Sequence, residues 1–362
     1  MTSPSPDGGG DRRRAEPATA TDTDTDTDTD TADPAEAPDL EEVPSMLLSR
    51  VAENAYWVGR YLERAEATAR LVKTHTELFV DLPKSAGLTW APLLAVTGSD
   101  ADYHLAHDHP AEEEVVSFLL SDPLNPGSVV SSVDQAREDL RVTRTMVPRR
   151  TWETLNELHL WVRDTRRSAI ARPTRLAWCE EVIRRCHLVA GSIYATMNRD
   201  DTYSFLEIGR FVERADMTTR VLEVEADILM GVSDQGLRPF VDVTWLAALR
   251  SLGAEQMYRR ATGGVVHGAD AVRFLLFEPA FPRSVEHCLI AVSRWLLELP
   301  RQEVPMAECA AVARRLGEFD PISGGADELL EMVDELQRSL GELHDALGAT
   351  YFLPAPSLTG AG

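Results

Sequence analysis

The chain contains an internal duplication, and this feature limits its possible folds more than any other. Residues 59–66 read GRYLERAE, and 150 positions later residues 209–216 read GRFVERAD. Further matches follow in the same order with only six residues of drift. They are Thr89-Trp90 with Thr244-Trp245, Tyr103 with Tyr258, and residues 118–129 with residues 274–285. Self-similarity of this kind is typical of repeated structural units, so the sequence predicts two tandem copies of one unit.

Apolar residues recur in steps of three and four around both copies of the motif. This spacing places them along one side of a helix and predicts two long motif helices. The two apolar seams are Leu48, Val51, Ala55, Val58, Leu62, Ala65, Ala69, Val72 and Phe205, Ile208, Val212, Ala215, Thr219, Leu222, Ala226, Leu229. The sequence has no alternating strand pattern with hairpin turns. We therefore expect an all-α fold: a multi-helix bundle made of two tandem pseudo-symmetric helical repeats.

The remaining helices are predicted from the same periodicity. Each copy is expected to continue with a Trp-bearing helix and a short helix that ends at an Asp/Glu-Pro turn. The Pro-x-Ser-Val segments at 126–129 and 282–285 are expected to open a longer helix with proline in its first turn. Bridging helices are expected at about 151–169 and 174–198, and final helices near 305–318 and 326–348.

Composition and pattern together divide the chain into four parts. Residues 1–44 are rich in Pro, Gly and Ser and then in Thr-Asp repeats, so we expect a disordered acidic tail without a core. Residues 45–170 are assigned to helical repeat 1. Residues 171–352 are assigned to helical repeat 2 with the bridging and C-terminal helices, and residues 353–362 to a flexible tail.

The formal net charge of −23 restricts the partners of the chain. Lys73 and Lys84 are its only lysines, and an acidic, lysine-poor surface is typical of proteins from a high-salt cytoplasm. Such a surface disfavours binding to nucleic acid, which needs a basic patch, and to anionic membranes. The sequence shows neither an apolar stretch of membrane-spanning length nor a secretory apolar region. We expect a cytoplasmic protein.

The charged residues of the motif lie off the apolar seam at helical spacing, so their side chains are within reach of one another. They are Arg60, Glu63, Arg64, Glu66 and Arg70 in the first copy and Arg210, Glu213, Arg214, Asp216 and Arg220 in the second. We predict a buried Glu-Arg network between the two motif helices, related by a pseudo-twofold axis. A network of this kind is costly to desolvate and fixes helix register. A ligand or partner site and a plain solvated face are the alternatives.

Two features favour the buried network. Gly59 and Gly209 lie inside the motif helices, where glycine costs about 1 kcal/mol relative to alanine. Glycine is expected there if another backbone approaches closely. The charged positions are also the same in both copies, whereas solvated positions differ: Arg50, for example, corresponds to Asp200.

The run from Leu47 to Glu66, LLSRVAENAYWVGRYLERAE, resembles the opening of the bacterial and archaeal alpha-E proteins, which are helical and named for a Glu-Arg motif. The motif is Glu63-Arg64 here, with a second copy at Glu213-Arg214, and the resemblance covers about 45–350. Such proteins typically occur beside, or fused to, circularly permuted ATP-grasp and transglutaminase-like proteins. The resemblance implies a role in making or modifying a peptide or amide-linked product. The Thr-Asp tail and a histidine-rich loop depart from the family pattern.

That loop carries the only metal-like cluster in the sequence, which comprises Asp102, His104, His107, Asp108 and His109. Imidazole and carboxylate suit zinc or another transition metal. The loop precedes proline and an acidic run, however, and the second copy has no histidines there. We therefore expect an exposed loop and no metal site.

Nucleophile and cofactor motifs are absent from the sequence. Cys179 and Cys186 follow an apolar helical pattern and are expected to be core thiols. The neighbours Cys186-His187 and His287-Cys288 point about 100° apart on a helix, so neither forms a nucleophile–base pair. There is no P-loop, Rossmann fingerprint, G-x-S-x-G or H-E-x-x-H. We expect no cofactor.

Three functions remain open, and the first is the one we favour. The chain is expected to be a non-catalytic accessory protein that binds an ATP-grasp or transglutaminase-like enzyme, its peptide product, or both. The second is an enzyme with Glu63 and Glu213 as acid/base residues and arginines that hold an anionic or amide substrate. The third is a structural oligomerisation module.

Overall fold

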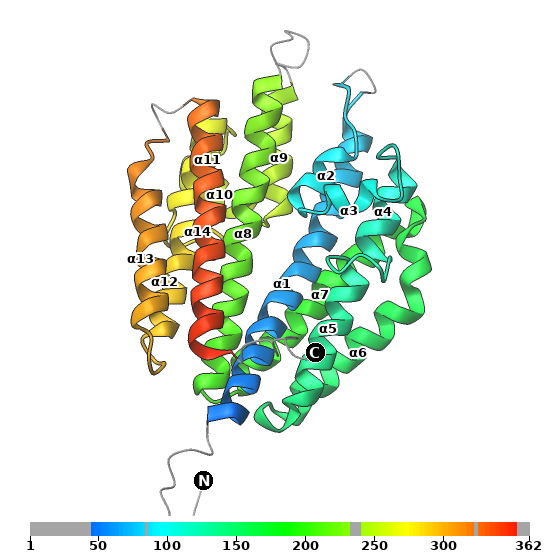
Figure 1. Cartoon of the computed structure of the whole chain (residues 1–362). Helices are drawn as coiled ribbons and strands as arrows, with labels where there is room; N and C mark the ends of the chain where they lie inside the picture. The colour runs from blue at the N-terminus through cyan, green and yellow to red at the C-terminus, as the bar shows by residue number, and fades with distance from the viewer. Residues whose placement is uncertain (1–44, 84–85, 232–239, 322–324, 353–362) are drawn as a thin grey trace, which may run out of the picture. The chain divides into compact units, whose positions relative to one another are not determined.

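The computed structural model describes residues 45–83, 86–231, 240–321 and 325–352, and these residues form α-helices without a β-strand (Figure 1). The expected all-α fold is confirmed for this part of the chain. The described residues group into one compact unit. The predicted tails at 1–44 and 353–362 lie outside the described residues.

Two long helices form the centre of this unit: α1 (Ser45–Asp81) and α8 (Asp201–Gly231). They contact each other extensively, and further helices pack against each of them, with α2 on α8 and α9 on both. The helices after α1 are α2 (Ala91–Val96), α3 (Asp100–His104), α4 (Glu112–Leu120), α5 (Val129–Val142), α6 (Arg149–Thr165) and α7 (Arg172–Thr196). The helices after α8 are α9 (Val241–Ser251), α10 (Glu255–Thr262), α11 (Gly268–Phe277), α12 (Val285–Leu296), α13 (Glu303–Glu318) and α14 (Ala326–Tyr351).

The packing of the longer helices follows the same plan around α1 and α8. Helices α5 and α7 pack against α1, and α6 packs against both of them. Helices α12 and α14 pack against α8, and α13 packs against both of them (Figure 1). The boundary at 170/171 would group α7 with the second repeat. Helix α7 contacts α1 and α6, and the boundary itself stays a prediction.

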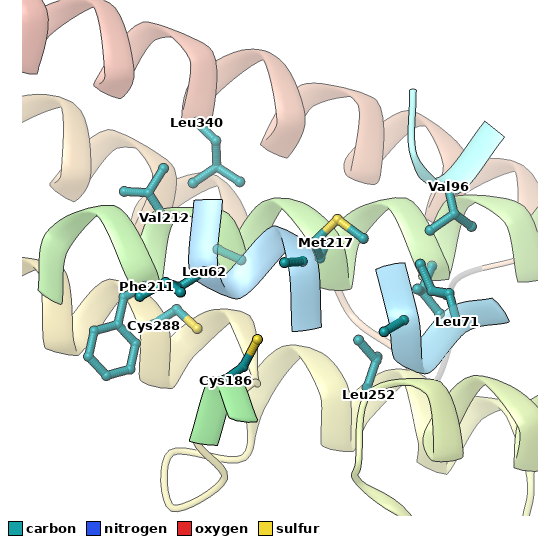
Figure 2. Close-up of a cluster of buried hydrophobic side chains, with 14 of the residues drawn as sticks. Leu62, Leu71, Val96, Cys186, Phe211, Val212, Met217, Leu252, Cys288 and Leu340 are labelled. Carbon is teal, nitrogen blue, oxygen red and sulfur yellow. The ribbon is translucent and has the colours of Figure 1, made fainter. Parts of the chain in front are cut away.

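The predicted apolar seams face the core wherever their side chains are described, and Leu48 and Leu229 lie outside that part. On α1, Ala55, Val58, Ala65, Ala69 and Val72 are buried. The seam of α8 is buried from Phe205 to Ala226 in the same way. Figure 2 shows part of this core, where Leu62 of α1, Val212 of α8 and Leu340 of α14 belong to one cluster of buried side chains. The hydrophobic periodicity therefore predicted both helices and the faces that they bury.

The two central helices touch backbone to backbone at their motif glycines. A Cβ atom added to Gly59 would lie 2.1 Å from the Leu206 carbonyl oxygen, and one added to Gly209 would lie 2.0 Å from the Tyr56 carbonyl oxygen. Both distances are far below van der Waals contact, so only glycine fits at either position. The expected close backbone approach is confirmed, and the approach is reciprocal.

The predicted starts of α5 and α12 need a correction. Pro126 and Pro282 were expected in the first turn, but each lies two residues before the N-cap. The N-caps are Ser128 and Ser284, whose hydroxyls accept hydrogen bonds of 3.1 Å from the backbone N–H groups of Ser131 and His287. A serine N-cap satisfies an N–H group that has no partner within the helix, which explains why the helices start there.

The other helix predictions agree with the structure to within a few residues. The helix expected at 151–169 is α6 followed by a 3-10 turn at Arg166–Ala169, and that expected at 174–198 is α7. The last two are α13 and α14. Trp90 is the residue before α2, whereas Trp245 lies within α9. None of the described helices combines the length and apolar character that crossing a lipid bilayer requires.

Candidate functional site

The crossing of α1 and α8 brings buried carboxylates and arginines together. Glu213 of α8 has only 1% of its side chain exposed and binds two arginines of α1. Arg60 donates from Nε over 2.6 Å to one carboxylate oxygen. Arg64 donates from Nε over 2.6 Å to the other oxygen and from Nη2 over 3.0 Å to the first. Both oxygens of Glu213 are thus held by guanidinium groups.

Glu63 of α1 occupies the corresponding place on the other side of the crossing. The Nε atom of Arg214, on α8, lies 2.9 Å from one of its oxygens. Arg283, in the turn before α12, donates from Nη1 over 2.8 Å to the other oxygen. The same guanidinium donates from Nη2 over 2.6 Å to Glu66. Arg283 therefore ties the motif of α1 to the start of α12.

The remaining motif residues pair mainly within their own helix. Arg70 donates to Glu66, and Arg220 donates to Asp216 over 3.1 Å. Arg210 does not cross to α1 as its counterpart Arg60 crosses to α8. It binds Glu207, one turn earlier on α8, over 2.6 Å. All ten predicted site residues thus take part in ion pairs, but only some of these pairs join α1 to α8.

Electrostatics favour the ionised form of the central carboxylate. Burial by itself raises the pKa of Glu213, but Arg64 and Arg60 outweigh that effect and lower the pKa to about 2. At Glu66, burial is again outweighed, here by Arg283, His187 and Arg70, and the pKa lies well below its ordinary value. The neighbouring Glu213 raises the pKa of the buried Arg60 against the effect of burial. This part of the network is therefore charged at neutral pH.

Several partners of the network were missed by the sequence analysis. Arg283 is the clearest case. It aligns with Gly127, between a matched proline and a matched serine, so an arginine opposite a glycine was the available signal. His187 of α7 has its Nε2 atom 3.0 Å from Glu66. The Tyr56 hydroxyl lies 2.9 Å from Nδ1 of His344 on α14 and accepts a hydrogen bond from Arg60. Arg283, His187 and His344 each lie more than 100 residues from the partner that they contact, and no spacing rule links residues that far apart.

The thiols beside the crossing are buried and unreactive. Cys186 and Cys288 are free, and burial raises the pKa of Cys288 to about 12 and that of Cys186 well above its usual value. A thiol that stays protonated is a poor nucleophile and a poor metal ligand. Cys179 is likewise free and buried, so the prediction of core thiols is confirmed.

The histidine-rich loop makes short-range contacts of its own. His104 lies 3.7 Å from Asp100, and His107 lies 3.7 Å from Glu114. Within the described ranges, no group of three or more His, Cys, Asp or Glu side chains is arranged to hold a metal ion. The loop lies on α3 and in the segment before α4, away from the motif residues in sequence and in its hydrogen bonds.

One groove offers access to the edge of the network. It has a volume of about 540 Å³ and is lined by residues of α1, α7, α9 and α10. Arg70 and His187, which both contact Glu66, are among them, together with Lys73 and Arg250. A ligand that entered this groove would meet guanidinium and ammonium groups that already have carboxylate partners.

Comparisons with known proteins identify a family with the same motif. Residues 47–352 match the family model Alpha-E, described as a predicted alpha-helical domain with a conserved ER motif. The chain is also similar to uncharacterized proteins of Mycobacterium bovis and of two strains of Mycobacterium tuberculosis, with 26% identity over 329 residues. These matches cover 83% of this chain but 36% of each relative, so the chain spans about a third of their length. No solved structure matches. Given the family match and the paired Glu-Arg motifs at the helix crossing, the chain belongs to the Alpha-E family.

Proposed function

We propose that the chain consists of two tandem pseudo-symmetric helical repeats, with the boundary after α7 rather than at residue 170. Burial along the flanking helices supports this. Each of the seven buried residues of α7 has a buried counterpart 154 positions later on α14. Each of the five buried residues of α12 has a buried counterpart 156 positions earlier on α5. The proposed repeats are therefore α1 to α7 and α8 to α14.

We propose further that the protein is a non-catalytic accessory protein of a cytoplasmic ATP-grasp or transglutaminase-type system that makes or modifies a peptide. The main support for a non-catalytic role comes from Glu213, whose two carboxylate oxygens both bind arginines. Its pKa of about 2 leaves it without a proton to donate and makes it a weak base. Such a carboxylate is suited to holding the two helices together. The surface around the crossing would then be the part of the protein that binds a partner.

The relatives are much longer than the part that this chain matches, which supports the proposal that the helical unit works with a partner. This chain matches about a third of each mycobacterial protein, so in those proteins the helical unit belongs to a much longer chain. The ATP-grasp or transglutaminase-like partner follows from the family resemblance.

One surface gives this proposal a specific test. Helices α11, α12 and α13 form a groove of about 460 Å³, beside which Ile290 and Leu297 are 54% and 66% exposed. The corresponding residues of α5 are Asp134 and Arg141, so the second proposed repeat is apolar where the first is charged. Exposed apolar patches on a charged protein are typical of interaction surfaces.

The experiment is affinity purification from the native host at its own ionic strength, with cross-linking and mass spectrometry. The baits are the full chain, Leu297→Asp, and the control Leu160→Asp, which changes another exposed leucine, on α6 (52% exposed). We expect an ATP-grasp or transglutaminase-like protein with the wild type and the control, and its loss with Leu297→Asp. Recovery of the chain alone from all three baits contradicts the accessory role.

An enzymatic function remains the second candidate, because the groove lined by Arg70 and His187 reaches the edge of the Glu-Arg network. Glu213→Gln separates the two functions. If the network is structural, the variant should be less stable than the wild type. If the carboxylate is catalytic, the variant should lose activity while its stability is unchanged or raised. An oligomerisation module, the third alternative, predicts a stable homo-oligomer of the pure chain in sedimentation equilibrium.

A further inference from the structure

A small cavity lies between α1, α2, α8 and α9, apart from the helix crossing. Its volume is about 60 Å³. Most of its walls are aliphatic, with Leu71, Val96, Val221 and Ala248 among them. A water molecule needs roughly 10–15 Å³ of such volume, so the cavity has room for about four to six non-hydrogen atoms.

The cavity contains one acid without a cationic partner. Glu225 of α8 is buried and lines the cavity, and its Oε2 atom has no hydrogen-bond partner. No lysine or arginine is among the described residues of the lining. A buried carboxylate without a cation is unfavourable, because desolvation is not offset by charge pairing. Burial accordingly raises the pKa of Glu225 to about 7, against a smaller opposing effect of the Thr244 hydroxyl.

The one histidine of the lining does not supply the missing charge. Nε2 of His75 lies 2.8 Å from the carbonyl oxygen of Thr89. A carbonyl only accepts, so the ring proton is on Nε2 and Nδ1 keeps its lone pair. Burial lowers the pKa of His75 to about 4, so the ring is neutral at physiological pH. Of the described residues that line the cavity, only His75 of α1 and Glu225 of α8 titrate; α2 and α9 contribute apolar and hydroxyl side chains.

The chemistry of the lining selects among cations. Hard metal ions such as Ca²⁺ take about six to eight oxygen ligands, and this cavity offers one carboxylate and a few hydroxyls. An alkylammonium ion instead needs one counter-ion and an apolar surface for its carbon chain. We propose that the cavity binds an aliphatic primary ammonium group, with the Glu225 carboxylate as its counter-ion. This inference rests on the cavity and on the unpartnered oxygen, and it is independent of the accessory role proposed above.

The proposed site uses a position at which the two central helices differ. Glu225 corresponds to His75 at the offset of 150 that relates the two motifs. Each residue therefore takes the same place on its own helix, and both side chains line one cavity. Because one of the pair is an acid and the other a neutral ring, the site has a single charged end.

The test is isothermal titration of the full chain with n-butylamine and, separately, with 1-butanol. We expect saturable binding of the amine at about pH 8 and no binding of the uncharged alcohol. Binding should be roughly tenfold weaker at about pH 6, because the amine stays protonated while Glu225 takes up a proton. A lysine amide and a lysine-containing peptide, run beside butylamine, distinguish a free small amine from a peptide side chain as the ligand.

Glu225→Gln is the decisive variant, since it keeps the shape of the side chain and removes the charge. It should abolish amine binding and leave the chain folded with an equal or higher melting temperature. Glu157→Gln, a change at an exposed glutamate of α6, is the matched control and should bind like the wild type. Equal binding by Glu225→Gln, equal binding of butanol, or no binding of any amine by the wild type would each overturn the proposal.

Discussion

Two buried glutamates on α8 show how neighbouring side chains determine whether a buried carboxyl group is charged. Glu213 and Glu225 are both removed from water, and burial raises the pKa of each. Two arginines reverse that effect at Glu213 and bring its pKa to about 2, whereas Glu225 has no arginine and its pKa stays at about 7. Burial alone therefore says little about charge, and the identity of the neighbours decides it.

Glu213→Gln should strongly destabilise the protein at neutral pH. The change leaves Arg60 and Arg64 without their buried carboxylate, and breaking a buried ion pair in this way costs about 3–5 kcal/mol. Urea denaturation measures the loss. Glu138→Gln removes an exposed carboxylate that also pairs with arginine and should change the free energy of unfolding little. A similar small effect for both variants would contradict a structural role of the network.

The same carboxylate should produce a pH dependence of stability. Its folded-state pKa is below the unfolded value of about 4.5, so its contribution is complete above that pH and is lost as the pH falls toward about 2. Unfolding free energies measured from neutral to acidic pH should therefore fall steeply for the wild type. Glu213→Gln should give a shallower slope over this range, and parallel slopes would show that other groups cause the loss.

At the scale of helices, Gly59 and Gly209 set the distance between α1 and α8. Gly59→Ala would place a Cβ atom 2.1 Å from the Leu206 carbonyl oxygen, so the helices must separate. We expect a loss of about 3 kcal/mol in thermal or urea unfolding, at the upper end of the usual cost of overpacking. The control is Gly191→Ala on α7, where an added Cβ meets nothing within 4 Å. It should stabilise the protein by about 0.5–1 kcal/mol. A tolerated Gly59→Ala would show that the crossing relaxes easily.

The sequence could predict where the long helices lie and how closely they approach, but not all of the contacts between them. Periodicity located α1, α6, α7, α8, α13 and α14, because each buries one face along its length. The glycines predicted a close backbone approach, because glycine inside a helix needs a reason. The partners of Glu63 could not be predicted in full, since Arg283 reaches it from a turn 220 residues away. The cavity beside Glu225 depends on how four helices pack, and no local pattern encodes that.

For the molecule as a whole, the net charge of −23 predicts a salt-dependent stability. Repulsion among acidic side chains is screened by salt, whereas the buried pairs at the crossing are screened much less. Thermal melts should therefore shift to higher temperature from low to high KCl. An uncharged solute at equal osmolality is the control and should not reproduce the full shift. Equal melting temperatures at both salt concentrations would contradict the high-salt interpretation.

The reciprocal contact of the two motif helices also has an evolutionary consequence. In the proposed duplication, an ancestral half-length protein could have formed the same crossing as a homodimer, with each glycine against the partner's backbone. Fusion then made association intramolecular, so it no longer depended on protein concentration. After fusion each half could change alone, as with Arg283 opposite Gly127 and Glu225 opposite His75. A modern chain with these asymmetric residues could not return to two identical subunits.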